Sequence, residues 1–381
     1  PYRIFLPLIL KPAPVPIAPV YFTSIADDSL GGDTNGDGSS TSPQPGDWGH
    51  VAFLDNSVDA ESLIGNAVIQ YGGKFINYSN EYYDCWNCTY LGAIRFEGAS
   101  PTIRSNTLQH NVGYALTGNV NSYPVVSNNT IRDNGGNGLE IRGGTISTDL
   151  PVTRYWRNTD IVYAVTGHVT IPSGITLVIE PGVTVKFGTN KLMGVNGVLR
   201  VQGTSGNPVN ITSLKDDTLG GDTNGDGSAS GPQAGDWGHI NFRDSSVDGE
   251  NLIEYAVIQY GGYFKALYNE YYSCYNCTYL GAIRFEGASP TLRYTVIHQN
   301  EIGLRSKTGS LPNIINNAIY DNNQYALFNE DNTIIINAVN NWWGDSSGPY
   351  HPSNNPSGTG NAVSNYVDFS PWLTGSPVII P

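Results

Sequence analysis

The sequence predicts an all-β chain folded as a parallel β-solenoid of two tandem units. Three observations support this: a long internal duplication, a shorter repeat within each copy, and the lack of any run with helical hydrophobic spacing. Apolar residues come instead in short β-branched runs, such as NAVIQYGG from Asn66, separated by Gly, Asn and Pro. These features together indicate stacked short strands.

The duplication centres on an acidic loop. Residues 27–50 read DDSLGGDTNGDGSSTSPQPGDWGH, and residues 216–239 read DDTLGGDTNGDGSASGPQAGDWGH, 189 positions later (216 − 27). The same offset relates LGAIRFEGASPT from Leu91 to its copy from Leu280. The acidic loop therefore belongs to a long repeated unit.

Each copy also contains a repeat of coil length. Pro101 and Pro124 are 23 positions apart (124 − 101), as are Asn106 and Asn129 (129 − 106). A period of this length suits one coil of a solenoid, in which apolar residues stack on those of the next coil. We expect Asn and Gly to take the left-handed conformations of the turns between strands.

The chain divides into four segments. Residues 1–18 form an N-terminal arm, residues 19–149 the first unit, residues 150–340 the second unit and residues 341–381 a closing segment. Residues 150–207, the opening coils of the second unit, have no counterpart in the first copy. The first unit is therefore expected to lack its opening coils.

The N-terminal arm combines an apolar run with a proline-rich spacer. Prolines at positions 12, 14, 16 and 19 predict an extended polyproline II segment. The apolar run before them has no polar face, and burying its large side chains contributes on the order of 10 kcal/mol. Something must therefore cover these side chains: Ile4, Phe5, Leu6, Leu8, Ile9 and Leu10.

Three features of the sequence resemble a known group of proteins. VTGHVTIPSGITLVIEPGVTVKFG from Val165 resembles the opening coils of secreted bacterial right-handed β-helix proteins of the pectate-lyase-like superfamily. The stretch from Asn341 to Leu373 resembles the segment that closes such helices, and GDTNGDG followed by GDWGH resembles loops in that group. The resemblance implies a right-handed parallel β-helix. It does not define an activity, because this fold carries lyases, hydrolases, adhesins and inert shafts.

Charge and cysteine content indicate an extracellular or cell-surface protein. The formal charge is −14 and the acids cluster in the two loops, which disfavours a nucleic-acid partner. No apolar run reaches the roughly 18 residues of a membrane helix. The chain begins with Pro rather than Met, so we expect a removed export segment before it. Two matching Cys-x-x-Cys pairs fit an oxidising exterior.

The acidic loops are predicted to bind calcium. Asp33, Asn35 and Asp37 stand at positions 1, 3 and 5, with Gly38 at position 6 and the Ser39 carbonyl at position 7. This arrangement resembles the first half of EF-hand and dockerin-type loops. Position 12 lacks the usual Glu, so a further acid is expected from elsewhere in the loop. A solvated acidic turn is the alternative, although carboxylates this dense repel one another without a cation.

The complete sets of predicted ligands follow the duplication. In the first copy the further acid is Asp27, Asp28 or Asp47. The equivalents in the second copy are Asp222, Asn224, Asp226 and Ser228, with Asp216, Asp217 or Asp236. We therefore expect two or more Ca2+ ions.

The cysteines form two Cys-x-x-Cys pairs, Cys85 with Cys88 and Cys274 with Cys277. Such a pair can be a redox couple, half of a zinc site or a small disulfide. Zinc would need both pairs together, but they lie several coils apart on a solenoid. The redox reading needs a helix N-terminus, and none is evident. We therefore expect two structural disulfides, each stapling a protruding loop.

Aromatic residues surround both cysteine pairs. They could form a flat platform for sugars, or pack on themselves or against another subunit, as aromatic residues often do at interfaces. The residues are Tyr82, Tyr83, Trp86 and Tyr90 in the first copy and Tyr271, Tyr272, Tyr275 and Tyr279 in the second.

Arg95 with Glu97 recurs as Arg284 with Glu286 in the repeated AIRFEG strands. Two positions apart on one strand face, each pair is expected to be a surface ion pair rather than catalytic machinery. The ordered Asp pairs and Arg-Ile-Lys of polygalacturonases are missing. A catalytic role is therefore not expected.

The function expected from these observations is structural. Two repeats span 378 residues (2 × 189) of the 381, so the chain ends close to where a third copy would resume. We expect copies of the chain to assemble head to tail into an extracellular filament, the arm Ile4–Leu10 being donated to the next subunit as an added strand. The alternatives are a cell-surface adhesin or carbohydrate-binding β-helix, and next a polysaccharide lyase.

Overall fold

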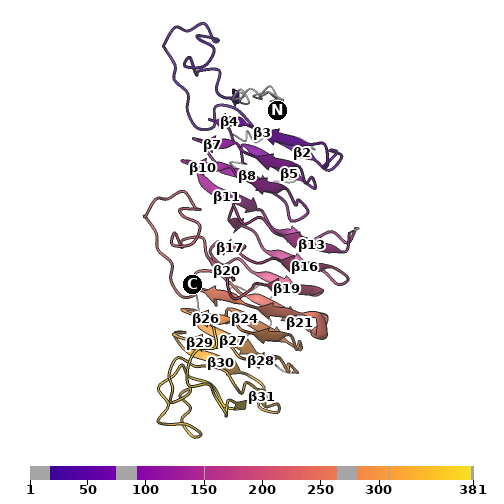
Figure 1. The fold of residues 1–381 in the computed structure, drawn as a ribbon, viewed down its shortest axis with the longest axis vertical. Helices are drawn as coiled ribbons and strands as arrows, with labels where there is room; N and C mark the ends of the chain where they lie inside the picture. Colours follow the sequence, from indigo (N-terminus) through magenta and orange to yellow (C-terminus); the bar gives the residue numbers. More distant parts are fainter. Residues whose placement is uncertain (1–17, 74–91, 150, 264–280, 308, 379–381) are drawn as a thin grey trace, which may run out of the picture.

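The computed structural model describes residues 18–73, 92–149, 151–263, 281–307 and 309–378. These residues form a right-handed parallel β-helix, an elongated stack of coils in which every pair of named strands runs parallel (Figure 1). The predicted fold class is confirmed. The one named helix of the described residues is the 3-10 turn η1 (Asp248–Glu250), and none of their helices has the length and apolar character to cross a membrane.

Three long sheets carry most of the described coils. The longest has ten strands: β2 (Val51–Leu54), β5 (Ile94–Glu97), β8 (Tyr114–Gly118), β11 (Gly136–Ile141), β14 (Tyr163–Val165), β17 (Thr184–Phe187), β20 (Val209–Ser213), β23 (Ala256–Gln259), β26 (Val296–His298) and β29 (Ala318–Tyr320). A seven-stranded sheet contains β12 (Gly144–Thr145), β15 (Val169–Ile171), β18 (Met193–Val195), β21 (Ile240–Arg243), β24 (Ile283–Glu286), β27 (Ile302–Ser306) and β30 (Tyr325–Asn329). A six-stranded sheet contains β13 (Thr153–Trp156), β16 (Thr176–Ile179), β19 (Val198–Gln202), β22 (Leu252–Glu254), β25 (Thr291–Arg293) and β28 (Asn313–Ile315).

Shorter sheets occupy the two ends of the described stack. At the N-terminal end are β1 (Val20–Phe22), β4 (Ala67–Gln70), β7 (Thr107–Gln109) and β10 (Thr130–Arg132), beside β3 (Leu63–Gly65), β6 (Thr102–Arg104) and β9 (Val125–Ser127). At the C-terminal end β31 (Ile336–Asn337) pairs with β32 (Val367–Asp368). The ten-stranded sheet passes through both sequence units, so they form one continuous β-helix.

The core consists of ladders of apolar side chains from equivalent positions of successive coils. Ile64 pairs with Ile103, which pairs with Val126, and all three are buried. Phe53 stacks on Phe96 with ring centroids 6.1 Å apart. Because strand side chains alternate in direction, the intervening residues, such as Arg104, point to solvent.

Asparagine has two roles. Some asparagines take the left-handed conformation, as expected, among them Asn66 (φ 53°) and Asn128 (φ 54°). Others form buried ladders. Asn106 and Asn111 are buried, and their amides stack as ladders rather than forming the left-handed turns. Asn111 Nδ2 donates to Asn134 Oδ1 at 2.8 Å and to the Ile69 carbonyl at 3.1 Å. The left-handed conformation falls one residue earlier, at Ser105 (φ 56°) and His110 (φ 55°). The turn directs the following amide inward, where it satisfies backbone groups of adjacent coils.

Among the named strands of the described residues, equivalent strands of the two copies are nineteen apart, as β2 and β21 are (21 − 2). Each coil has three strands, so an offset of nineteen strands is six whole coils and one extra strand. The offset is therefore not a whole number of coils, and β2 belongs to the ten-stranded sheet whereas β21 belongs to the seven-stranded sheet. Both acidic loops nevertheless project on the same side of the stack (Figure 1). The second copy is therefore not a simple continuation of the first within the same ladders.

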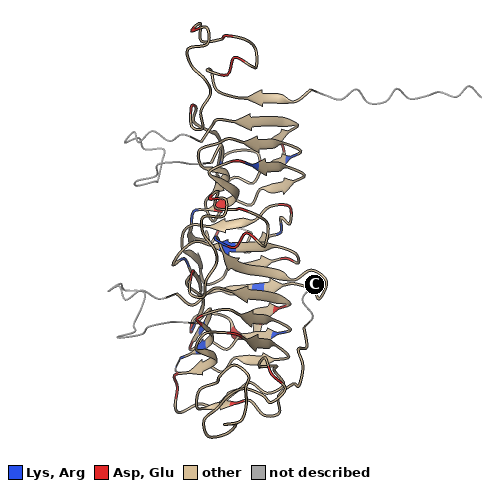
Figure 2. Ribbon diagram, turned by 90° about the vertical axis from the view of Figure 1, so that its left-hand side faces the viewer, with Lys and Arg blue, Asp and Glu red and all other residues tan. Residues whose placement is uncertain are grey.

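The first coil has an open edge. Among the described residues β1, β2 and β3 each pair with a strand on one side only, whereas their counterparts β20, β21 and β22 each pair on both. Val20 is 58% exposed and its equivalent Val209 is 0% exposed. The first acidic loop stands beyond this coil at the end of the molecule (Figure 2). At the other end the closing segment buries Trp343, Val363 and Phe369.

Candidate metal centre

Three carboxylates converge in the first acidic loop. Asp28, Asp33 and Asp37 each offer an oxygen, and these oxygens all lie within 4.8 Å of one another. Oxygens that bind one Ca2+ at about 2.3–2.6 Å lie no more than about 5 Å apart. The spacing therefore suits shared coordination of a hard cation.

Tight turns shape the loop around Asp33. Its Oδ1 accepts hydrogen bonds from the backbone N–H groups of Gly36 (2.7 Å) and Asp37 (3.1 Å), and its Oδ2 accepts one from Gly38 (2.9 Å). Gly36 and Gly38 have φ of 74° and 76°, a region that L-residues with side chains rarely adopt. The sequence DTNGDG thus folds around its first aspartate.

Two oxygens of the cluster lack a protein partner. Asp28 Oδ1 and Asp37 Oδ1 are shielded from solvent and accept no hydrogen bond within the described residues. Desolvation, followed by the charges of Asp33, Asp37 and Asp27, raises the pKa of Asp28. Buried anionic oxygens without a donor are unfavourable unless a cation is present.

The other predicted acids hold the loop in place. Asp27 Oδ2 accepts from Thr23 Oγ1 (2.6 Å) and from Gln70 Nε2 (3.1 Å). Asp47 Oδ2 accepts from Ser24 Oγ (2.6 Å) and from the backbone N–H of Gln44 (2.9 Å). Of the three acids considered for the missing position 12, the structure therefore brings only Asp28 into the cluster.

The second loop repeats this arrangement. Oxygens of Asp217, Asp222 and Asp226 lie within 4.8 Å of one another, and Asp217 Oδ1 and Asn224 Oδ1 are shielded and without a hydrogen-bond partner. Asp216 accepts from Thr212 Oγ1 and Gln259 Nε2, matching Asp27. Asp236 accepts from Ser213 Oγ, matching Asp47, and also pairs with Lys215 Nζ at 2.7 Å.

A buried lysine, which the sequence analysis did not identify, distinguishes the second loop. Lys186 on β17 is fully buried, and its Nζ donates to the Gly221 carbonyl at 2.7 Å. Desolvation lowers its pKa to about 8, although nearby Asp216, Asp217 and Asp222 favour the charged form. Position 186 belongs to the opening coils, which the first copy lacks, so the two candidate sites differ electrostatically.

The remaining predicted positions lie in the loop turns or outside the described residues. Ser39 and Ser228 lie in the same turns as the clusters, and their carbonyls stay predicted ligands. The arm residues 4–10, the four cysteines and the tyrosine-rich segments around them lie outside the described residues. Their expected roles therefore remain predictions.

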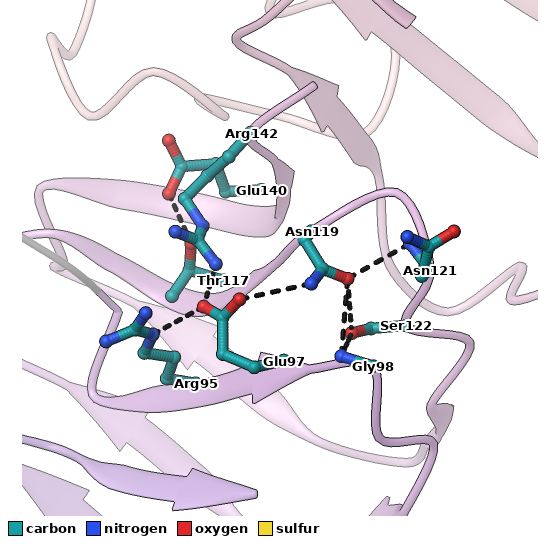
Figure 3. A network of polar contacts seen from close by, with 9 residues as sticks. All are labelled: Arg95, Glu97, Gly98, Thr117, Asn119, Asn121, Ser122, Glu140 and Arg142. Carbon is teal, nitrogen blue, oxygen red and sulfur yellow. Dashed lines mark hydrogen bonds and ion pairs between the residues drawn. The ribbon is translucent and has the colours of Figure 1, made fainter. Parts of the chain in front are cut away.

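The Arg95–Glu97 pair is not the surface ion pair expected from the sequence. Arg95 is 3% exposed, and its Nε lies 2.5 Å from Glu97 Oε1, which also contacts Arg142 (Figure 3). Glu97 Oε2 accepts from Asn119 Nδ2, while Thr117 donates to the neighbouring Glu140. Burial lowers the pKa of Arg142 to about 10. Strand stacking encloses these charges from coil to coil, which the spacing of two residues could not reveal.

A cavity of about 470 Å³ lies beside the turns that follow β2, β5 and β8 and the strand β13. Tyr123, Tyr155 and Arg154 contribute to its lining, together with Asp55 and Asp59. The Arg157 guanidinium lies 4.3 Å from the Tyr155 ring centroid. Aromatic faces beside carboxylates and guanidinium groups can contact a polar ligand that has apolar faces.

Comparison of the chain with protein-family models, with curated proteins and with solved structures gives no match.

Proposed function

We propose that this chain is the subunit of an extracellular filament, a calcium-stabilised β-helix that assembles head to tail by donating its N-terminal arm to a neighbouring copy. The observation that carries this proposal is the open first coil. Among the described residues, its strands have no partner strand on their outer side, and they present apolar side chains at one end of the molecule.

The second copy shows what a covered first coil looks like. There β17, β18 and β19 pair with β20, β21 and β22, and Ile240 and Phe242 are buried. Their equivalents Val51 and Phe53 in the first copy are only partly buried. A further layer supplied by another copy would bury apolar area at about 25 cal/mol per Å².

Calcium would act as a structural ion in this assembly. Each loop gathers three carboxylates, and a bound Ca2+ would neutralise most of their mutual repulsion and hold the loop against its coil. Secretion, disulfides in the cysteine-bearing loops and membership of the pectate-lyase-like superfamily belong to the same proposal. They rest on the sequence arguments above.

Electron microscopy of negatively stained full-length protein in calcium buffer tests the proposal, beside a variant that lacks residues 1–18. Filaments of the full-length chain that disappear on truncation would support arm donation. A second variant, Leu6→Asp with Ile9→Asp, keeps the chain length and removes only the apolar character of the arm. Single short rods in every sample would contradict the filament.

The cavity beside Tyr123 and Tyr155 favours one alternative, a carbohydrate-binding β-helix at the cell surface. Sugar rings could stack on the tyrosine faces while Asp55 and Asp59 bind hydroxyl groups. A glycan array with the wild type and a Tyr155→Ser variant tests this. Tight binding by the wild type alone would support it. A lyase would instead release an ultraviolet-absorbing product from pectin or alginate.

A further inference from the structure

The second acidic loop docks on the coil before it. The backbone N–H of Asn137, in β11, donates to the Thr223 carbonyl at 2.9 Å, and Asn137 Nδ2 donates to the Asp222 carbonyl at 2.9 Å. Thr223 is fully buried as a result. The loop that carries the candidate metal ligands is thus hydrogen bonded to the end of the first copy.

Glycines allow this close docking. A Cβ on Gly225 would lie 2.6 Å from the Gly135 carbonyl oxygen, and one on Gly220 would lie 2.3 Å from Val162 Cγ2. The receiving surface therefore includes Gly135, Asn137 and Val162.

The first loop has the same sequence but lacks such a surface. LGGDTNGDGS is identical from Leu30 and from Leu219. Thr34, the equivalent of Thr223, is exposed, and a Cβ on Gly36, the equivalent of Gly225, would meet nothing within 4 Å. No described residue of the chain takes the place that Asn137 takes beneath the second loop.

The C-terminal end of the molecule carries the counterpart of that surface. β30 is the equivalent of β11, and Leu327 pairs with Val363 as Leu139 pairs with Tyr163. This register places Tyr325 where Asn137 stands and Ala362 where Val162 stands. Both residues line a hollow of about 530 Å³.

Aromatic rings border this hollow. Tyr350 and Tyr366 are 45% and 47% exposed, and Phe328 packs beside Tyr325 with ring centroids 5.0 Å apart. Exposed aromatic side chains that gather in a concavity are typical of protein interfaces. The hollow therefore lies where a further acidic loop would dock if the repeat continued.

We propose that this hollow receives the first acidic loop of a second copy, which is the interface of the head-to-tail filament. The inference rests on the function proposed above and deepens it. Tyr325 has no side-chain amide, and it pairs with Ile302 of β27, whereas Asn137 lies in a register shift of β11. The contact with the first loop is therefore expected to come from the aromatic rings, which meet the glycine-rich turn. The occupant is the loop Asp33–Gly38.

Disulfide trapping between two full-length variants tests this interface. One variant carries Thr34→Cys and the other Tyr325→Cys, the positions equivalent to Thr223 and Asn137, whose backbones are hydrogen bonded. Mixing them under mild oxidation should give a covalent dimer at least tenfold above either variant alone or the wild type. The background of the native cysteines is measured in those same controls.

Other outcomes distinguish a failure of the proposed interface from a failure of the proposed filament. If the wild type forms filaments but the mixture gives no covalent dimer, the docking is wrong and the filament stands. If a mixture of Ala13→Cys and Tyr325→Cys gives the dimer instead, the hollow binds the proline-rich arm and the inference is overturned. If neither filaments nor covalent dimers form, both proposals are contradicted.

A second variant keeps the test independent of cysteine chemistry. Thr34→Arg changes an exposed side chain, so the fold should be retained while assembly falls at least tenfold in light scattering. The matched change Thr223→Arg introduces the same side chain at a buried position and should instead lower the unfolding temperature. Unchanged assembly by Thr34→Arg would overturn the docking.

Discussion

Adjacent aspartates in each acidic loop have different environments and are expected to have different roles. Asp27 accepts hydrogen bonds from Thr23 and Gln70, whereas Asp28 turns an oxygen without a donor toward Asp33 and Asp37. In the second copy Asp216 and Asp217 differ in the same way. One residue of each pair therefore holds the loop, and the next is expected to bind the proposed cation.

This assignment predicts the effect of Asp28→Asn. Because one carboxylate charge is lost from the cluster, calcium affinity at the first loop should fall about tenfold or more. Isothermal titration calorimetry measures the change, with Asp55→Asn as a control at an exposed acid outside the cluster. An unchanged calcium isotherm for Asp28→Asn would remove this residue from the site.

His239 gives a prediction about pH. Desolvation, followed by Arg284, Arg243 and His168, lowers its pKa from 6.5 to about 3. As the pH falls below 6.5 the unfolded chain binds a proton that the folded chain does not, so stability should fall with pH. The loss at pH 5 is about 2 kcal/mol at about 1.4 kcal/mol per pH unit.

Urea denaturation at pH 7 and pH 5 checks this value. His239→Gln should lose about 2 kcal/mol less than the wild type between the two pH values, because it removes this titration. His110→Gln, a change at an outer turn, serves as the control. Equal losses in His239→Gln and the wild type would contradict the assignment.

At the scale of elements, amide ladders join successive coils. Asn111 accepts from the Gly72 N–H at 2.8 Å and donates to a carbonyl of one coil and to an asparagine of the next. Its side chain thus connects three coils within the buried core. The ladder holds the turns that place the strands in register.

Asn111→Ala should therefore lower the free energy of unfolding by about 2–4 kcal/mol, because buried backbone groups lose their partners. Asn313→Ala, at an exposed position of β28, should change it by less than about 0.5 kcal/mol. Chemical denaturation of both variants gives the comparison. Similar values for the two would show that the ladder contributes little to stability.

At the scale of the whole molecule, the chain is a stack whose coils mainly contact their neighbours. The open coil at one end and the bordered hollow at the other define two different ends. If two unlike ends of this kind bind each other, the contact is head-to-tail and extends into a filament where the rotation does not close. The difference between the two ends is therefore a property of the fold itself.

Removal of calcium is expected to destabilise the whole stack. At a calcium concentration one hundred times Kd, each site contributes about 2.7 kcal/mol to the folded state. Circular dichroism melts in calcium and in chelator should therefore differ in Tm, and added magnesium should restore less of the difference than calcium does. Identical melting curves in calcium and chelator would rule out a stabilising ion.

The sequence alone determined the fold class, because the two repeats and the β-branched runs are local patterns that only stacked coils satisfy. It also located the acidic loops, since DTNGDG specifies its own turns. It could not select Asp28 over Asp27 and Asp47, because Thr23, Ser24 and Gln70 become their partners only after the coil has closed.

The tertiary structure decided the features that depend on stacking between distant residues. Lys186 contacts the second loop, and Arg142 contacts Glu97, because residues far apart in sequence become adjacent when the coils stack. The nineteen-strand offset and the hollow beside Tyr325 likewise follow from how coils stack. Local sequence sets which residues form strands and turns, whereas the packing of one coil on the next sets which side chains meet.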